Sequence, residues 1–352
     1  MQSTRLFPAL NLLTNPVLMS EMDGTLIYRN DEAMKRLQIP HLTRKVFGHF
    51  TPTARKTLKN HETALPAFLD YTTYGSTVTV YVDRLTLDDR EVLFYFFSHL
   101  FDFSLMEHHK LTPDKTLLGE FSGNKLAKLA IAAYEREDLP EALDNRKRHI
   151  TATRVLKKLV AGILDEIYDN GEKFLYLIED VNEILSAATE TTLSRFGLNI
   201  AFPMRIFENS DILIDFKPFL LLFSQIMVLF AEVSVSKNAT VRITEQEDTV
   251  LYELAGRVKR EYHRIFIGGA ESFSYVLPGT LLDLFTFNAL CKNQGYEFGF
   301  TLRDNDDLNL TFRLNIPIER RYAVSDRTPT EKERLLTFIK QASHTLLDSG
   351  IS

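Results

Sequence analysis

The stretch SYVLPGTLLDLFTFNALCKNQGYEFGF, residues 274–300, has the outline of a loop and helix that could hold a ligand. It predicts a short loop, a helix of about four turns and a strand opened by Gly295. Loops that hold phosphate are rich in glycine, because only glycine lets backbone amides approach phosphate oxygens closely and takes positive φ angles. Here Leu281, Leu282 and Asp283 face the expected cavity instead. The segment therefore has the outline of a binding loop without the glycines that a phosphate group would need.

Two other groups of residues could carry chemistry. Glu107, His108 and His109 have metal-binding side chains, but adjacent histidines point in different directions and no third ligand follows at a useful spacing, which argues against a metal site. Cys291 is the single cysteine, which excludes an intramolecular disulfide and a cysteine-based zinc site. Its apolar surroundings favour a buried structural thiol. We expect no metal and a reducing, cytoplasmic setting.

Composition restricts the class of protein. The 352 residues are 45% hydrophobic and 25% charged, which is long and apolar enough for two or three packed domains. With 41 Lys and Arg against 47 Asp and Glu the formal charge is −6, so no basic field attracts nucleic acid or anionic lipid. No run of about 18 uncharged apolar residues occurs, and MQSTRLFPALNLLTNP lacks a signal-peptide core. We expect a globular cytoplasmic protein without membrane insertion.

The first hundred residues predict a compact α/β module. Asp23-Gly24 joins two strand-like runs, a strong local hairpin signal, and Asn30 or Asp31 is placed to cap the helix that follows. STVTVYVDRL (76–85) and EVLFYFFSHLF (91–101) predict a second, longer hairpin turned by LDDR.

This order of elements, with DG at a hairpin and N-x-E-A just after it, resembles a PAS domain over residues 8–105. Such modules sense a ligand between sheet and helices or pair with another copy. The sequence names no ligand, and His99 is interpreted as a packed or edge residue rather than a haem ligand.

Residues 106–123 predict a linker, and residues 124–200 predict a helical hairpin that turns at Asn170-Gly171. Both predicted helices carry apolar residues spaced three and four apart: Leu156, Leu159, Ile163 and Ile167 on the outgoing helix, and Phe174, Leu177, Val181, Ile184 and Ala188 on the return helix. One hairpin cannot bury both stripes. We favour a homodimer with a four-helix bundle; the alternative is a hairpin packed on its own neighbouring domain.

Such a module followed by a helical hairpin is similar to the front of a sensor histidine kinase. Residues 201–320 continue the resemblance: their order of helices and strands matches the GHKL-type ATP-binding fold shared by histidine kinases, gyrases and the heat-shock ATPases. Asp215 stands where that family often has an aspartate, and IF at 265–266 resembles a family loop motif. The expected fold class is a multidomain α+β protein with a C-terminal ATPase-like domain.

The family's nucleotide residues are replaced at the matching positions. The Asn that helps hold Mg²⁺ falls on Phe230 or Ala231, neither of which offers an oxygen ligand from its side chain; Glu232 is turned about 100° away. The aspartate of D-x-G-x-G, which binds the adenine amino group, falls on Leu254 or Ala255, and only Gly256 remains.

The family's lid, G-x-G-L-G-L, matches PGTLLDL. Gly279, Leu282 and Leu284 are kept, and Leu281 and Asp283 take the other two glycine positions. A carboxylate near the triphosphate costs about 4 kcal/mol, or about three decades of affinity. We interpret the domain as a pseudokinase that does not bind ATP or Mg²⁺ in the usual manner. The alternative is that this alignment with the family motifs is wrong by a few residues, and that polar groups of KNATVRITEQED or VKREYHR take the functional roles.

His149 lies near the place of the family's phospho-accepting histidine. Thr153 matches the polar residue four positions on, but Ile150 and Arg154 replace the usual acid and proline. Without the acid, phosphoryl acceptance is poorly assisted. RKRH also has the composition of a solvated basic helix face, which we favour.

Residues 328–350 predict a capped amphipathic C-terminal helix, which packs on the last domain or engages a partner. The resemblance implies a signal-transduction protein that senses a ligand and docks a response regulator or another kinase. The alternative is a phosphotransferase or divergent kinase that uses His149.

Overall fold

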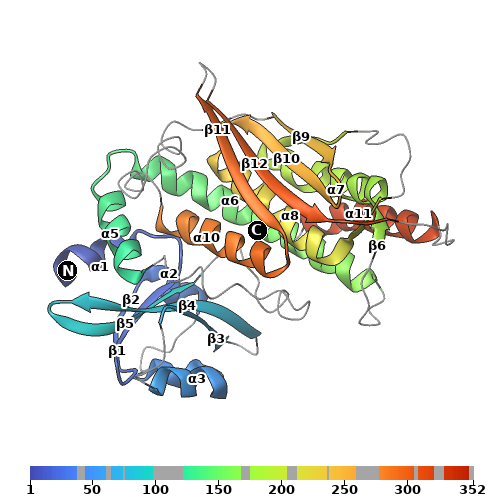
Figure 1. Ribbon diagram of the computed structural model, residues 1–352. Coiled ribbons are helices and arrows are strands. Elements are labelled where there is room, and N and C mark those ends of the chain that lie inside the picture. The colour runs from blue at the N-terminus through green and yellow to red at the C-terminus, as the bar shows by residue number, and fades with distance from the viewer. Residues whose placement is uncertain are drawn as a thin grey trace. The chain divides into compact units, whose positions relative to one another are not determined.

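The computed structural model describes residues 1–37, 44–60, 65–73, 76–97, 122–167, 175–203, 212–235, 238–258, 277–304, 308–320 and 329–348. The chain forms two compact units, the first from Met1–Lys147 with Gly268–Ala289 and the second from Arg148–Ile267 with Leu290–Ser352 (Figure 1). The expectations for His99, for residues 107–109, for Asn170-Gly171 and for the IF pair at 265–266 lie outside the described residues.

The first unit contains a five-stranded antiparallel sheet in the order β2-β1-β5-β4-β3. Its strands are β1 (Val17–Glu21), β2 (Leu26–Arg29), β3 (Ala67–Thr73), β4 (Ser76–Leu87) and β5 (Arg90–Phe97). Both predicted hairpins are confirmed. Gly24 has a φ of 84°, and Asp88 and Asp89 have φ values of 45° and 60°, the left-handed pair that a two-residue hairpin turn requires.

Side chains that alternate along the strands give this sheet two buried faces. One face packs against α2 (Asp31–Arg36), η1 (Val46–His49) and α3 (Pro52–Lys59), with Tyr71, Val82 and Tyr95 in the shared core. On the opposite face the carboxylate of Asp83 accepts a hydrogen bond from the amide of Gly123, at the start of α5 (Gly123–Tyr134). Helix α5 in turn packs against α1 (Ser3–Asn11). Figure 1 shows α3 on one side of the sheet and α1 and α5 on the other.

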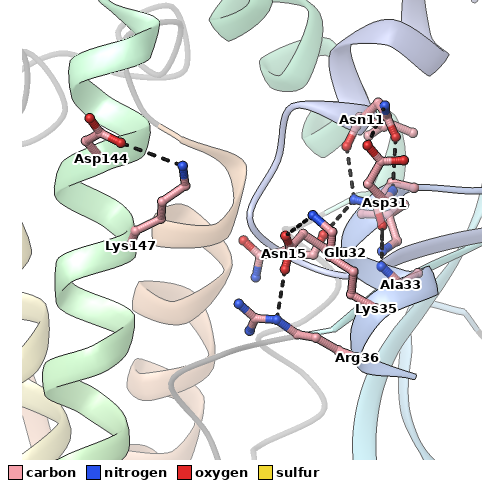
Figure 2. Close-up of polar contacts among 12 residues, drawn as sticks. Asn11, Asn15, Asp31, Glu32, Ala33, Lys35, Arg36, Asp144 and Lys147 are labelled. Atoms are coloured by element: carbon pink, nitrogen blue, oxygen red, sulfur yellow. Dashed lines mark hydrogen bonds and ion pairs between the residues drawn. The ribbon is translucent and has the colours of Figure 1, made fainter. Parts of the chain in front are cut away.

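Asn30 joins the elements at the N-terminal edge of this unit. Its Oδ1 accepts hydrogen bonds from the amides of Val17 and Ala33, both at 2.9 Å, and so caps α2 as predicted. Its Nδ2 donates to the carbonyls of Leu10 at 3.0 Å and Asn15 at 2.8 Å. Beside it, Asn11 of α1 and Asp31 of α2 exchange two hydrogen bonds, of 3.2 and 3.0 Å (Figure 2). One fully buried amide thus links α1, β1 and α2.

Two long helices contribute residues to both units. Helix α6 (Leu139–Glu166) begins after α5 with Pro140 as its second residue, because proline is tolerated in the first turn of a helix. Helix α10 (Pro278–Asn293) is followed by Gly295, whose φ is 72° and whose amide donates to the carbonyl of Lys292. The amides of Gln294 and Tyr296 donate to the carbonyl of Cys291 and close the last turn before β11 (Glu297–Asp304). Cys291 is buried, as predicted, and burial raises the pKa of its thiol.

The second unit contains a five-stranded sheet in the order β11-β12-β10-β9-β7, antiparallel except for the parallel pair β7 and β9. Its strands are β7 (Asn199–Ala201), β9 (Asn238–Glu245), β10 (Thr249–Arg257), β11 (Glu297–Asp304) and β12 (Leu308–Pro317). Burial alternates along β10, and the buried Tyr252 contacts Phe219 and Phe223 of α8 (Phe216–Val233). The predicted mixed α/β layer is therefore confirmed.

The predicted return helix over residues 172–197 is corrected in part. Residues Leu175–Leu177 form a short strand, β6, which pairs with β8 (Ile212–Asp215), and β8 also pairs with β13 (Glu319–Arg320). The helix α7 (Ile178–Thr192) begins only after it, and the 3₁₀ turn η3 (Leu193–Phe196) follows. These three residues form a strand because their backbone pairs with β8. The spacing of apolar residues along the sequence does not show this pairing.

The C-terminal helix α11 (Pro329–Asp348) packs within the second unit. Leu335 and Ile339 are fully buried, α11 lies along α7 (Figure 1), and Phe338 contacts Gly162 of α6. The apolar stripe that suggested a second copy, Leu156, Leu159, Ile163 and Ile167, is no more than 2% exposed. A single chain therefore covers this stripe, and the alternative of packing on the chain's own neighbouring elements explains it.

Helix α8 is the one described helix that is long and apolar enough, by length and composition, to cross a membrane. It carries Lys217 and Glu232, and 89% of its residues are buried inside the structure. Its apolar side chains form the centre of the second unit.

Replacing Asn30 with alanine is expected to destabilise the protein by roughly 4 kcal/mol, because it removes four hydrogen bonds and leaves buried backbone groups unpaired. Urea unfolding followed by circular dichroism measures this. Asn124→Ala, at an exposed position of α5, is the matched control and should change stability by no more than about 0.5 kcal/mol. Equal effects of the two variants would contradict the linking role of Asn30.

Candidate functional site

The segment PGTLLDL is helical in the structure, which corrects the loop expected there. Helix α10 begins at Pro278, so Gly279, Leu281 and Asp283 lie in its first two turns. Proline at the start of a helix and leucines after it favour this conformation. Gly279 does not have a positive φ, so the left-handed freedom of glycine is not the reason for its presence.

Asp283 forms a buried ion pair with Arg146 of α6. The guanidinium Nη2 donates to the carboxylate Oδ2 at 2.6 Å, and the two side chains are 2% and 0% exposed. A buried carboxylate without a counter-charge is strongly unfavourable, and a guanidinium at hydrogen-bond distance compensates it. The carboxylate expected to repel a triphosphate is therefore neutralised by a residue that the sequence analysis did not select.

Gly279 lies against the side chain of Asn15. A Cβ placed on Gly279 would meet Oδ1 of Asn15 and would lie 3.0 Å from its Cγ and 3.1 Å from Nη2 of Arg146. Asn15 cannot withdraw freely, because its Nδ2 donates to the carbonyl of Phe97 at 2.8 Å. The glycine thus serves the close approach of α10 to Asn15 and Arg146, which are both at least nine-tenths buried.

Phe230 and Ala231, where a magnesium ligand was sought, lie on α8 in the second unit. Phe230 is fully buried, and its ring meets Phe312 of β12 edge to face, with centroids 6.0 Å apart. Ala231 is partly exposed. This position of the helix supplies aromatic packing to the core of the unit, and neither side chain offers a metal ligand.

Leu254, Ala255 and Gly256 lie toward the C-terminal end of β10, in regular antiparallel register. Leu254 is opposite Phe312 and Gly256 is opposite Leu310 of β12, while Leu254 and Ala255 are also paired with β9. Leu254 is 1% exposed. Their backbone groups belong to the sheet ladder, and the side chains that replace the adenine-binding aspartate are apolar.

His149 lies on α6 and is partly buried. The hydroxyl of the buried Thr153 donates to the backbone carbonyl of His149 at 2.7 Å. Ile150 is buried and Arg154 is exposed. The hydroxyl four residues on is therefore engaged with the backbone of the helix in this structure.

The predicted site residues fall into two groups, each packed in its own unit. Gly279, Leu281 and Asp283 lie in the first unit, and Phe230, Ala231 and residues 254–256 lie in the second. Among the described residues, no group of three or more His, Cys, Asp or Glu side chains is arranged to hold a metal ion.

The sequence analysis missed Arg146 and Asn15, the two residues that surround the start of α10. Arg146 lies on the apolar stripe of α6, because Leu139, Leu143, Arg146 and Ile150 follow at spacings of four, three and four. A cation at such a position indicates a buried charge in need of a partner. This signal was present in the sequence, but was interpreted as part of the basic run RKRH.

No family model matches this sequence, and no curated protein matches it. Among solved structures, it is similar to the histidine kinase ThkA in complex with the response regulator TrrA, with 14% identity and a TM-score of 0.32 over 86% of this chain and 95% of that one. It is similar to the Acinetobacter baumannii histidine kinase AdeS, with 12% identity and a TM-score of 0.30 over 60% and 97%. It is also similar to full-length ShkA in complex with AMPPNP, with 17% identity and a TM-score of 0.31 over 62% of this chain and 42% of that one. Scores of this size carry no argument about function.

Replacing Asp283 with asparagine is expected to cost about 3–5 kcal/mol of folding stability, because it strands the buried charge of Arg146. The double variant Arg146→Met with Asp283→Leu should recover most of that loss, since apolar side chains need no counter-charge. Asp144→Asn is the control, as Asp144 pairs with Lys147 on the exposed face of α6 (Figure 2). Urea unfolding measures all three. A double variant no more stable than Asp283→Asn would refute the charge argument.

Gly279→Ala should destabilise the protein by about 1–3 kcal/mol, because the new methyl group overlaps Asn15. Gly299→Ala provides a matched control, since a Cβ there meets no atom within 4 Å. Thermal unfolding of the two variants compares them directly. If both variants melt with the wild type, Gly279 is not required for packing.

Proposed function

We propose that this chain is a signal-transduction protein related to sensor histidine kinases that has lost nucleotide chemistry and acts by binding. In this proposal the residues that a kinase would use for Mg²⁺, adenine and phosphate have become packing residues. The observation that carries it is the start of α10, where the side chain of Asn15 packs against Gly279 and the carboxylate of Asp283 is paired with Arg146. Phe230 and Leu254, both buried in the second unit, support it independently.

The proposal assigns sensing to the N-terminal segment as a PAS-like module. The strand order β2-β1-β5-β4-β3 supports it, as does the cover of α2, η1 and α3 over one face of the sheet. Within that core the hydroxyl of Tyr71 is buried and has no hydrogen-bond partner among the described residues, while His49 stacks on its ring at 5.5 Å. An unpaired buried hydroxyl favours a small polar guest at this point.

The proposed partner is a response regulator or another kinase, and the proposed setting is the cytoplasm; both follow from the sequence resemblance and composition alone. The apolar stripe of α6, which was the sequence argument for a homodimer, no longer supports one. Leu156, Leu159, Ile163 and Ile167 are covered within one chain, so a second copy would have to use another surface. The alternative, phosphotransfer through His149, gains no support from the contact between Thr153 and the His149 carbonyl.

The test is a nucleotide titration followed by thermal unfolding. A ligand at 100 times its Kd stabilises a protein by about 2.7 kcal/mol, which raises the melting temperature by several degrees. We expect 5 mM Mg-ATP to leave the melting temperature unchanged relative to Mg²⁺ alone. A saturable rise would contradict the loss of nucleotide binding.

The second arm incubates the protein with a phosphorylated response regulator. Transfer of phosphate to wild-type protein that is abolished in His149→Ala would replace the adaptor proposal with the phosphotransferase alternative. Binding of the regulator without transfer, unaffected by His149→Ala, is the expected result.

A further inference from the structure

A polar stripe on α7 forms one wall of a cavity in the second unit. Glu179, Glu183 and Ser186 lie on the side of α7 away from the buried Val181, Ile184 and Leu185. Asn182, itself buried, lies at the border of this stripe and also lines the cavity. With Asp180, with Phe202 and Pro203 after β7, and with Lys332 of α11, they enclose a cavity of about 400 Å³. This volume falls within the range of small-molecule sites.

The amide of Asn182 lies within this wall with one half of its hydrogen-bonding capacity unused. The side chain is 3% exposed, and its Oδ1 accepts a hydrogen bond from the buried hydroxyl of Tyr252 at 3.1 Å. Its Nδ2 has no hydrogen-bond partner among the described residues. A buried amide donor without a partner is unfavourable, and because Asn182 lines the cavity, an acceptor on a guest that reaches this donor would satisfy it.

The charges around the cavity are predominantly negative. Lys332 bridges Asp180 at 2.9 Å and Glu183 at 3.0 Å, and these carboxylates raise the pKa of its ammonium group. Glu179 adds a third carboxylate, so three acids face one base. A positively charged guest would be attracted and would share the carboxylates that Lys332 now holds.

We propose that this cavity binds a small cationic molecule that carries an ammonium or guanidinium group and, a short distance away, a hydrogen-bond acceptor oxygen. The cation lies at Glu179, Asp180 and Glu183, the acceptor oxygen takes the hydrogen bond of Asn182, and Phe202 and Pro203 form the apolar wall. This site is separate from the residues expected to bind nucleotide, and it stands whether or not the proposed function does.

Two probes that carry equal charge at pH 6, where both of their amines are protonated, separate the two halves of the proposal. L-Argininamide carries both cationic groups and an amide carbonyl, whereas agmatine carries the cationic groups without an acceptor oxygen. Isothermal titration calorimetry should show saturable binding of both to the wild type, with argininamide about tenfold tighter, the usual effect of one buried hydrogen bond. In Asn182→Ala the difference should disappear. Should Asn182→Ala fail to fold, judged by circular dichroism, the charge variants below decide alone.

The charge variants carry matched controls on the same helices. Glu183→Gln should weaken both probes about fivefold to tenfold, and Glu190→Gln, an exposed position of α7 outside the cavity, should not. Lys332→Gln should strengthen binding several-fold by releasing Asp180 and Glu183, while Lys340→Gln, exposed on the same helix, should have no effect.

Three results would overturn the proposal. The first is that neither probe binds, or that binding is indifferent to Glu183→Gln and Asn182→Ala. The second is weaker binding in Lys332→Gln, which would make Lys332 an anchor for an anion. The third is saturable binding of succinate or inorganic phosphate at this place, lost in Lys332→Gln.

Discussion

Burying a charged side chain is strongly unfavourable unless an opposite charge lies next to it, and in this protein that constraint organises the first unit. Arg146 of α6 and Asp283 of α10 are both almost fully buried, and each is tolerated only because the other lies at hydrogen-bond distance. The pair fixes the start of α10, which brings Gly279 against Asn15. Asn15 binds the end of β5 through Phe97, and its carbonyl accepts from Asn30. The close packing of Gly279 on Asn15 and the hydrogen bonds of Asn15 and Asn30 thus connect α10 with β5 and β1.

The same contacts explain why the start of α10 is a poor place for an anion. A phosphate-binding helix start leaves amides and cations unpaired so that a ligand completes them. Here the guanidinium of Arg146 is already bonded to the carboxylate of Asp283, and the side chain of Asn15 occupies the space beside Gly279. At α7 the situation is reversed, since the amide of Asn182 keeps a free donor beside a cavity. The buried polar groups at these two places differ in whether the described residues satisfy them.

Local chemistry predicted much of the fold, and tertiary partners account for most of what it missed. Asp23-Gly24, Asp88-Asp89 and the Asn30 cap follow from backbone preferences of a few residues, so the sequence alone was sufficient. The short strand β6 depends on pairing with β8, some forty residues away, and no local pattern encodes it. For the site, the sequence showed that Phe230 and Leu254 are apolar, but it did not show that Arg146 is the partner of Asp283. Periodicity shows which face of a helix is buried without showing which residue it meets.

The first unit is not continuous in the chain, because residues of α10 complete it. Arg146 and Asp283 are 137 residues apart. At a synthesis rate of roughly 5–20 residues per second, a nascent chain carries Arg146 for on the order of ten seconds before its counter-ion is translated. During that interval the first turns of α6 lack the carboxylate that compensates the buried charge of Arg146. The contact between α6 and α10 therefore cannot form until α10 has been synthesised, however early the sheet of the first unit folds.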